Sequence, residues 1–142
     1  MKTAIQRGRT NLEGVTGRNL LVLVVEDDVE LRDLWGTVLE QLGFAVVSAK
    51  NGVEGLRQFR RAQPDLVITD VRMPEMDGLT LVRKIRSDSE LVPIVVVTGY
   101  KTPELDAMAT DPRRLQVLRK PFTVGKFVLR LRALGLLEPG WA

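Results

Sequence analysis

The sequence predicts a doubly wound α/β fold, with a five-stranded parallel sheet in the flavodoxin-like order 2-1-3-4-5 inside a three-layer sandwich. Three observations support this prediction. Short, strongly apolar stretches recur along the chain, as is typical of strands buried on both faces. Segments with helical periodicity alternate with them. The connections between strands and helices are short, which favours right-handed crossovers that place helices on both faces of the sheet.

The first half of the chain supplies two strands and two helices, in the order Leu20–Val25, Val29–Leu42, Phe44–Ala49 and Gly52–Gln63. Gly43 ends the first helix, as Gly commonly does after a C-cap. Asn51 is suited to cap the second helix, and Pro64 stops it. The side chains expected to face the core are Leu31, Leu34, Trp35, Val38, Leu42, Val53, Leu56 and Phe59.

The second half supplies, in order, a strand Leu66–Asp70, a helix Leu79–Ser87, strands Pro93–Thr98 and Gln116–Arg119, and a last helix capped by Thr123. The segment Gly99–Leu115 is weakly patterned and holds at most two helical turns around Glu104–Ala109. Met73-Pro74 and Asp77-Gly78 force a loop after Asp70, and we interpret Asp77-Gly78 as a turn signal only. The expected core-facing side chains are Leu79, Val82, Ile85, Val124, Phe127, Val128, Leu131 and Leu134.

Composition limits the chemistry that the chain can perform. Its 142 residues suit one domain, and its 44% hydrophobic and 27% charged residues are ordinary for a globular protein. It has neither cysteine nor histidine, which excludes disulfides, thiolate metal sites and the commonest general base. Any reaction must therefore use carboxylates, hydroxyls, Lys or Arg.

Charge and hydropathy limit the partners and the location. The net charge of +3 is mild, and no basic recognition element points to direct nucleic-acid binding. The longest apolar run, Leu20–Val25, is too short to span a bilayer, and the polar start lacks a secretory signal. We therefore expect a cytoplasmic protein without membrane contact. The expected domain covers 20–135, between a flexible N-terminal extension, 1–19, and a C-terminal tail, 136–142.

Polar side chains stand where the predicted strands end. Glu26, Asp27 and Asp28 follow the first strand, Asp70 ends the third, and the fourth and fifth strands end at Thr98 and Lys120. In the order 2-1-3-4-5 the first and third strands are neighbours, so their carboxylates face one crevice at the ligand-binding edge. Because clustered carboxylates repel, a hard divalent cation such as Mg²⁺ is the expected cofactor.

The same edge predicts phosphoryl transfer. An Asp is already ionised at neutral pH, so Asp70 needs no general base to attack phosphorus. Lys120 and Thr98 would add a cation and a hydrogen-bond donor beside it. We infer transfer to Asp70, which gives a mixed anhydride that water later cleaves. Asp28 is interpreted as a helix cap.

The chain resembles the receiver domain of bacterial two-component response regulators, from about Leu20 to Leu134. Four motifs carry the resemblance, and they occur in the right order at the right strand ends. They are Val-Val-Glu-Asp-Asp after the first strand, Pro-Asp-Leu-Val-Ile-Thr-Asp-Val-Arg-Met-Pro-Glu-Met-Asp-Gly around the third, Val-Val-Thr-Gly at the fourth and Lys-Pro-Phe at the fifth.

The resemblance implies roles for individual residues. Asp70 would accept phosphate from a sensor histidine kinase or phosphotransfer protein, and the product would change contacts with a downstream protein. The resemblance further implies an acidic pair, Glu26 and Asp27, in which Asp27 binds Mg²⁺ directly beside Asp70 and the backbone carbonyl of Arg72. It implies that Thr98 and Lys120 contact the phosphoryl group. It also implies a cis peptide bond between Lys120 and Pro121.

The sequence departs from the family at its output switch. Receivers usually carry an aromatic residue three positions before the lysine, and here that position is Val117. The small residues usual before the fifth strand are replaced by Asp111-Pro112-Arg113-Arg114. We therefore hypothesise that Gly99–Leu115, with Tyr100 near Thr98, rearranges on phosphorylation.

Other functions stay open. A phosphatase of the haloacid dehalogenase type would need a second Asp where Arg72 stands. A dinucleotide-binding domain would want a glycine-rich turn where the acidic residues follow the first strand. A receiver-like docking module without a phosphorylation cycle remains an alternative, as does a piece excised from a larger regulator or hybrid kinase. The last helix also offers a docking or homodimer face, with the apolar candidates Leu129, Leu136, Leu137 and Trp141. The alternative is a tail that folds onto its own domain.

Overall fold

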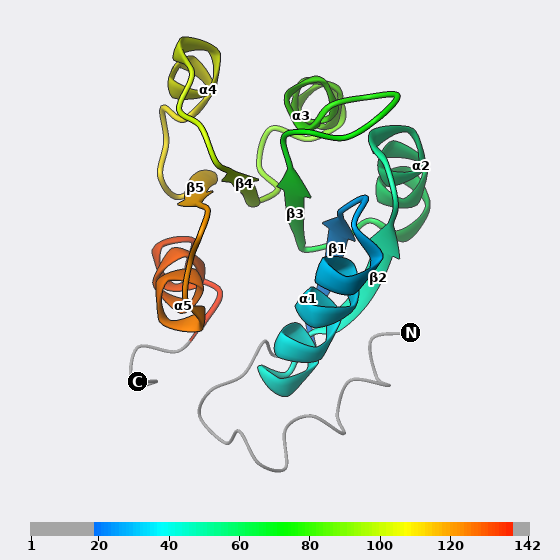
Figure 1. Ribbon diagram of the computed structural model, residues 1–142, viewed down its shortest axis with the longest axis vertical. Coiled ribbons are helices and arrows are strands. Elements are labelled where there is room, and N and C mark those ends of the chain that lie inside the picture. Colours follow the sequence, from blue (N-terminus) through cyan, green and yellow to red (C-terminus); the bar gives the residue numbers. More distant parts are fainter. Residues whose placement is uncertain (1–18, 138–142) are drawn as a thin grey trace.

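A computed structural model of the chain describes residues 19–137 (Figure 1). Its sheet has five strands, all parallel, in the order β2-β1-β3-β4-β5, which confirms the predicted fold class. The elements are β1 (Leu21–Val25), α1 (Val29–Gln41), β2 (Ala45–Ala49), α2 (Gly52–Ala62), β3 (Leu66–Asp70), α3 (Gly78–Asp88), β4 (Ile94–Thr98), α4 (Pro103–Met108), β5 (Leu115–Arg119) and α5 (Val124–Ala133).

The predicted caps are confirmed. Asp28, Asn51 and Thr123 each accept a hydrogen bond from a backbone N–H in the first turn of their helix. Each strand begins and ends within one residue of its predicted bounds. The weakly patterned segment holds the six-residue helix α4, about where two helical turns were expected.

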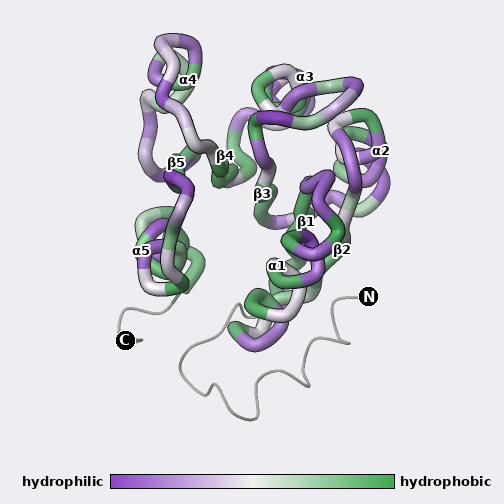
Figure 2. Tube along the Cα trace, in the orientation of Figure 1, coloured by the Kyte–Doolittle hydropathy of each residue, from purple (hydrophilic) through white to green (hydrophobic). Residues whose placement is uncertain are grey.

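The helices form two layers around the sheet. Helices α1 and α5 lie on one side of the strands, and α2, α3 and α4 lie on the other (Figure 1). The first layer packs Trp35, Leu39 and Phe127 against one face of the sheet, and the second packs Phe59, Leu81 and Ile85 against the other. In Figure 2 the tube is green along much of the central strands and purple beyond the end of β3. Polar residues therefore gather at the edge of the sheet where the strands end.

Three side chains predicted to face the core are exposed instead. Leu34 is 57% exposed, Val53 is 40% and Val124 is 51%. Successive residues on a helix are turned by about 100°, so Leu34 points well away from the direction of Trp35, and Val53 from that of Phe59. Val124 lies in the first turn of α5, where it lines an apolar groove between α1 and α5 together with Leu34. Leu39 and Leu81 were not among the predicted core residues, and both are fully buried.

The end of the described chain packs onto the domain. Leu137 is 7% exposed and lies in the same apolar cluster as Trp35, and Leu136 packs against that cluster. For Leu137, the structure therefore favours a tail folded onto its own domain over an exposed docking surface. Leu129 is 54% exposed on α5. Trp141 and residues 1–18 of the predicted N-terminal extension lie outside the described residues.

Asp77 and Gly78 do more than turn the chain. The Asp77 carboxylate caps α3 by accepting a hydrogen bond from the Thr80 N–H at 2.8 Å. The Gly78 N–H donates to the Val71 carbonyl at 2.8 Å. A Cβ at Gly78 would overlap the Asp70 carbonyl oxygen. The missing side chain therefore lets α3 begin against the backbone that carries Asp70.

We expect Gly78→Ala to destabilise the domain by about 1–3 kcal/mol, because the added methyl group must displace the backbone of Asp70 and Val71. Gly36→Ala is the matched control, since Gly36 lies in the interior of α1 and an added Cβ there meets no atom within 4 Å. It should stabilise the domain by about 0.5–1 kcal/mol. Urea unfolding measures both, and equal effects of the two substitutions would contradict this account.

Candidate functional site

The fold brings the predicted site residues to one edge of the sheet. Asp70 is the last residue of β3, and Thr98 is the last residue of β4. Glu26 and Asp27 follow β1, which pairs directly with β3. Lys120 follows β5, and its backbone N–H donates to the Thr98 carbonyl at 2.9 Å. All of these residues therefore stand at the carboxyl ends of the strands, where open α/β sheets bind ligands.

Three carboxylates converge at this edge. Glu26, Asp27 and Asp70 each offer an oxygen, and these oxygens lie within 4.8 Å of one another. Glu26 is 2% exposed and Asp70 is 7% exposed, whereas Asp27 is open to solvent. Such a set of clustered oxygen donors with one open side suits Mg²⁺, which binds a few carboxylates and keeps several waters. The residues present therefore fit the expected cofactor.

Lys120 supplies the positive charge of the site. Its Nζ lies 2.6 Å from Asp70 Oδ2, and the Lys120–Pro121 peptide bond is cis, as expected. Burial alone would lower the pKa of Lys120. The hydrogen bond that Lys120 donates to Asp70 and the negative charges of Asp70, Glu26 and Asp27 outweigh burial and raise that pKa above its usual value. Lys120 is therefore protonated throughout the physiological range.

Glu26 carries the most perturbed carboxylate in this site. Its pKa is raised from 4.5 to about 7, chiefly by burial, with smaller contributions from the charge of Asp70 and a hydrogen bond with Asp27. The Asp28 N–H, which donates to Glu26 Oε2 at 3.1 Å, and the charge of Lys120 act in the opposite direction. Without a cation, the site therefore holds more negative charge than its surroundings stabilise.

We expect the free energy of unfolding of the metal-free domain to fall as the pH rises from about 4.5 to about 7. In that range folded Glu26 keeps a proton that the unfolded chain has already lost, and stability falls with pH wherever the folded state binds more protons. Glu26→Gln should remove most of this pH dependence. At pH 8 its free energy of unfolding should exceed that of wild type by about 1–3 kcal/mol. Urea unfolding of both chains in the presence of chelator, repeated across this pH range, measures the effect. The exposed Glu90→Gln is the control, and parallel pH curves for wild type and Glu26→Gln would refute the assignment.

Thr98 and Tyr100 form a contact that the sequence indicated only in outline. The Thr98 hydroxyl donates to the Tyr100 carbonyl at 2.9 Å and accepts from the Tyr100 N–H at 3.0 Å. The Tyr100 ring packs under the guanidinium group of Arg72, whose Cζ lies 4.6 Å from the ring centroid. The backbone N–H of Arg72 in turn donates to Asp70 Oδ1 at 3.3 Å.

The sequence analysis missed the role of the Arg72 side chain. We expected only its backbone carbonyl to serve the site. The structure pairs Asp70 with Val97 in adjacent parallel strands, a register that the predicted strand order did not fix. Residues shortly after these two positions, such as Arg72 and Tyr100, are then neighbours at the same edge.

The loop between β3 and α3 is anchored on α2. The side-chain amide of Asn51 donates to Glu75 Oε2 at 3.4 Å, and Gly52 lies against the backbone of Met76. Asp27, Arg72 and Asp77 help to line an open groove along this loop. The groove therefore opens beside Asp27, the solvent-exposed member of the acidic cluster.

Fold and site together define a doubly wound α/β domain with a carboxylate and lysine site at the switch point of its sheet. The family model of the response regulator receiver domain matches residues 22–132. The chain therefore belongs to the receiver domains of response regulators, which are signalling domains of two-component systems. The resemblance carried by the four sequence motifs is confirmed.

Named relatives and solved structures agree with this family. The chain is 32% identical over 118 residues to the probable transcriptional regulatory protein TcrX of Mycobacterium tuberculosis, which covers 83% of this chain and 50% of TcrX. It is 34% identical over 113 residues to the response regulator MprA of Mycobacterium leprae, covering 80% of this chain and 50% of MprA. The chain thus spans about half the length of these relatives.

The structure is similar to that of the response regulator TrrA from Thermotoga maritima, solved in complex with Mg²⁺ and BeF. The TM-score is 0.72 at 29% sequence identity, and the match covers 81% of this chain and 98% of TrrA. Among residues 19–137, no helix combines the length and hydropathy needed to cross a bilayer.

Proposed function

We propose that this domain is a phosphoacceptor that receives a phosphoryl group on Asp70, with Mg²⁺, from a sensor histidine kinase or phosphotransfer protein. The observation that carries this proposal is the position of the Asp70 carboxylate. One of its oxygens is paired with Lys120 at 2.6 Å. The carboxylate also lies close enough to those of Glu26 and Asp27 for the three to hold one metal ion. A nucleophile in contact with a cation and part of a cation site matches the needs of phosphoryl transfer.

The residues of the chain have separate tasks in this reaction. A carboxylate oxygen of Asp70 attacks phosphorus while the bond from phosphorus to the donor nitrogen breaks. Lys120 balances the negative charge on the phosphoryl oxygens, and the Thr98 hydroxyl donates to one of them. Mg²⁺ held by Glu26, Asp27, Asp70 and the Arg72 carbonyl would supply further charge neutralisation. Water later attacks the mixed anhydride and restores the carboxylate, so the domain performs at most its own phosphorylation and dephosphorylation.

The proposed output is a change in protein contacts in the cytoplasm. The relatives TcrX and MprA are named as regulators and are about twice as long as this chain. We propose that the domain itself contacts a downstream protein rather than nucleic acid or membrane. A homodimer through α5, with the exposed Leu129 at its centre, is one form that this contact takes.

Labelling with a small acyl phosphate tests the proposal. The full chain is incubated with acetyl phosphate, with Mg²⁺ or with chelator, and its intact mass is followed over time. We expect a phosphoryl adduct that forms only with Mg²⁺ and is released by hydroxylamine, as an acyl phosphate should be. If no labile adduct forms in Mg²⁺, the phosphoacceptor role is wrong.

One observation favours a second function, a docking module without a phosphorylation cycle. Val117 occupies the position where the resemblance predicts an aromatic switch residue, and it is only partly buried against the core. Under this second function the domain binds its partner equally well with and without acetyl phosphate treatment. The same labelled and unlabelled samples therefore distinguish the two functions.

A further inference from the structure

The Thr98 hydroxyl is already hydrogen-bonded to the backbone of Tyr100. A hydroxyl has one hydrogen to donate, and that of Thr98 goes to the Tyr100 carbonyl, while its oxygen accepts from the Tyr100 N–H. Donation to a phosphoryl oxygen on Asp70 therefore requires the Thr98 hydroxyl to leave the Tyr100 carbonyl. As the hydroxyl turns toward Asp70, the bond from the Tyr100 N–H is lost with it.

The ring of Tyr100 is held by a second residue of the same site. The Arg72 guanidinium lies over the ring, and the backbone N–H of Arg72 donates to the Asp70 carboxylate. The ring is otherwise open, since Tyr100 is 59% exposed. A cation over an exposed ring is held weakly, and a phosphoryl dianion on Asp70, two residues from Arg72, competes for that cation. Both restraints on Tyr100 thus come from residues that a phosphoryl group on Asp70 attracts.

The segment after Tyr100 is attached to the domain at a few points, among them Met108 and Ala109, which pack against the core. Leu105 is the buried side chain of α4, and an ion pair between Glu104 and Arg83 ties the helix to α3. Thr102 caps α4 by accepting from the Leu105 N–H. Segments with few buried contacts open at low free-energy cost. Helix α4 is therefore able to move when its leading loop is released.

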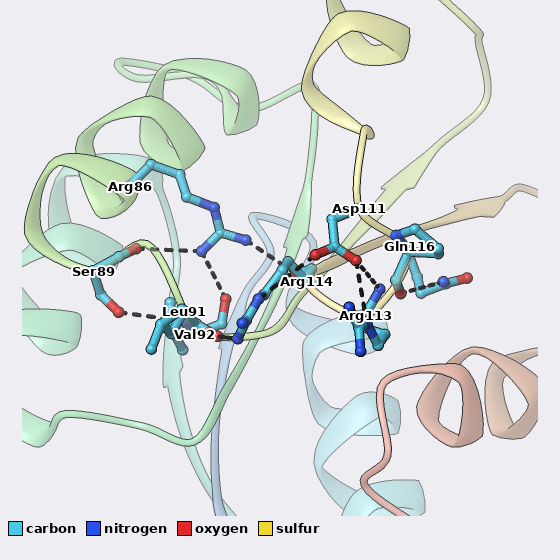
Figure 3. Close-up of polar contacts among 9 residues, drawn as sticks. Arg86, Ser89, Leu91, Val92, Asp111, Arg113, Arg114 and Gln116 are labelled. Atoms are coloured by element: carbon cyan, nitrogen blue, oxygen red, sulfur yellow. Dashed lines mark hydrogen bonds and ion pairs between the residues drawn. The ribbon is translucent and has the colours of Figure 1, made fainter.

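The far end of this segment is fixed. Figure 3 shows the Arg86 side chain reaching from α3 to backbone carbonyls, and it donates to Val92 at 2.7 Å and to Arg114 at 3.0 Å. Arg114 donates in turn to the Leu91 carbonyl at 3.3 Å and pairs with Asp111. These bonds join the connection before β4 to the connection before β5. Any movement that starts at Tyr100 is therefore confined to the chain between residues 99 and 110.

We propose that Tyr100 is the switch residue of this domain. A phosphoryl group on Asp70 draws Thr98 and Arg72 away from Tyr100, and the released loop carries α4 with it while the Arg86–Arg114 contacts hold the far end. Tyr100 thereby takes the task that Val117 is too small to perform. This inference rests on the proposed phosphoacceptor function.

Tyr100 is the single tyrosine of the chain, which makes a direct test simple. The full chain is labelled with 3-fluorotyrosine and followed by ¹⁹F NMR while Mg²⁺, beryllium and fluoride are added as a phosphoryl mimic. Fluoride bound at Asp70 gives its own resonances in the same spectrum. We expect bound-fluoride resonances together with a shift of the Tyr100 resonance. Bound fluoride with an unmoved Tyr100 resonance overturns the inference, whereas absence of bound fluoride overturns the proposed function.

Variants separate the two restraints. In Thr98→Val, at saturating beryllofluoride, we expect bound fluoride but little shift of Tyr100, because the isosteric side chain has no hydrogen bond to transfer. In Arg72→Met the shift should be smaller than in wild type. Val117→Thr keeps the volume of the side chain and should leave the shift unchanged. A full shift in Thr98→Val, or loss of the shift in Val117→Thr, would show that the signal takes another route.

Hydrogen exchange tests the fixed end. With beryllofluoride and Mg²⁺, we expect altered exchange of amides between residues 99 and 108 and unchanged exchange between residues 111 and 116. Arg86→Met should extend the altered region into residues 111 to 116. Altered exchange there in the wild type would contradict the fixed end.

Discussion

Asp70→Asn is expected to abolish phosphoryl labelling by acetyl phosphate while leaving the domain folded. The amide has the shape of the carboxylate but lacks its charge, so it is not a nucleophile at neutral pH. The loss should exceed about 100-fold, the scale on which single charged groups act in transfer reactions. Labelling is measured by intact mass in Mg²⁺, beside thermal unfolding of the same samples.

The stability readout makes this prediction specific. Asp70 repels Glu26 and contributes to its raised pKa, so Asp70→Asn relieves like-charge repulsion. Lys120 loses its partner, but its side chain is 35% exposed and remains hydrated. The thermal midpoint of the metal-free variant should therefore equal or exceed that of wild type at pH 8. A lowered midpoint would mean that the loss of labelling reflects unfolding.

Asp88→Asn is the matched control for Asp70→Asn. Asp88 is the last residue of α3, where it pairs with Arg60 at 2.8 Å on the surface. Exposed pairs of this kind contribute about 0–1 kcal/mol, so both labelling and stability should stay near wild type. If the Asp70→Asn chain is still labelled at the wild-type rate, the acceptor is another residue and the proposed function is wrong.

The sequence predicted the positions of site residues that lie at strand ends and the starts of helices that have a side-chain cap. Buried parallel strands must be continuously apolar, so their polar ends, such as Asp70 and Thr98, can be located without a structure. Side-chain caps such as Asp28 and Thr123 follow from the same local logic. The order of the strands then brings these ends together, because adjacent parallel strands end at the same edge.

The features that the sequence did not predict depend on distances between elements. The need for Gly78 arises because α3 begins directly against the Asp70 backbone, and a sequence shows only a turn there. The pairing of Arg72 with Tyr100 joins two loops, each of which has no pattern of its own. The exposure of Leu34 and Val53 depends on where a helix meets the sheet, which apolar periodicity fixes only to within about one residue position.

One electrostatic balance connects these observations. Three carboxylates share an edge of the sheet, and within the described chain Lys120 is the lysine that lies in direct contact with them. Its charge lowers the pKa of Glu26, while Asp70 raises it. The lysine therefore offsets part of the negative charge of the metal-free site, and it also pairs with one oxygen of Asp70. Removal of Lys120 should consequently act in opposite directions on metal binding and on phosphoryl transfer.

Lys120→Met is expected to slow labelling by acetyl phosphate about 100-fold, because the phosphoryl oxygens lose the ammonium group that neutralises them. Mg²⁺ should at the same time bind more tightly, since the carboxylates lose the positive charge that competes with the cation. Labelling rates and calorimetric Mg²⁺ titration at the same pH measure the two effects. Lys84→Met, an exposed position on α3, should change neither. If Lys120→Met weakens Mg²⁺ binding and labelling together, the lysine instead holds the site in shape, and its assigned role in charge neutralisation is wrong.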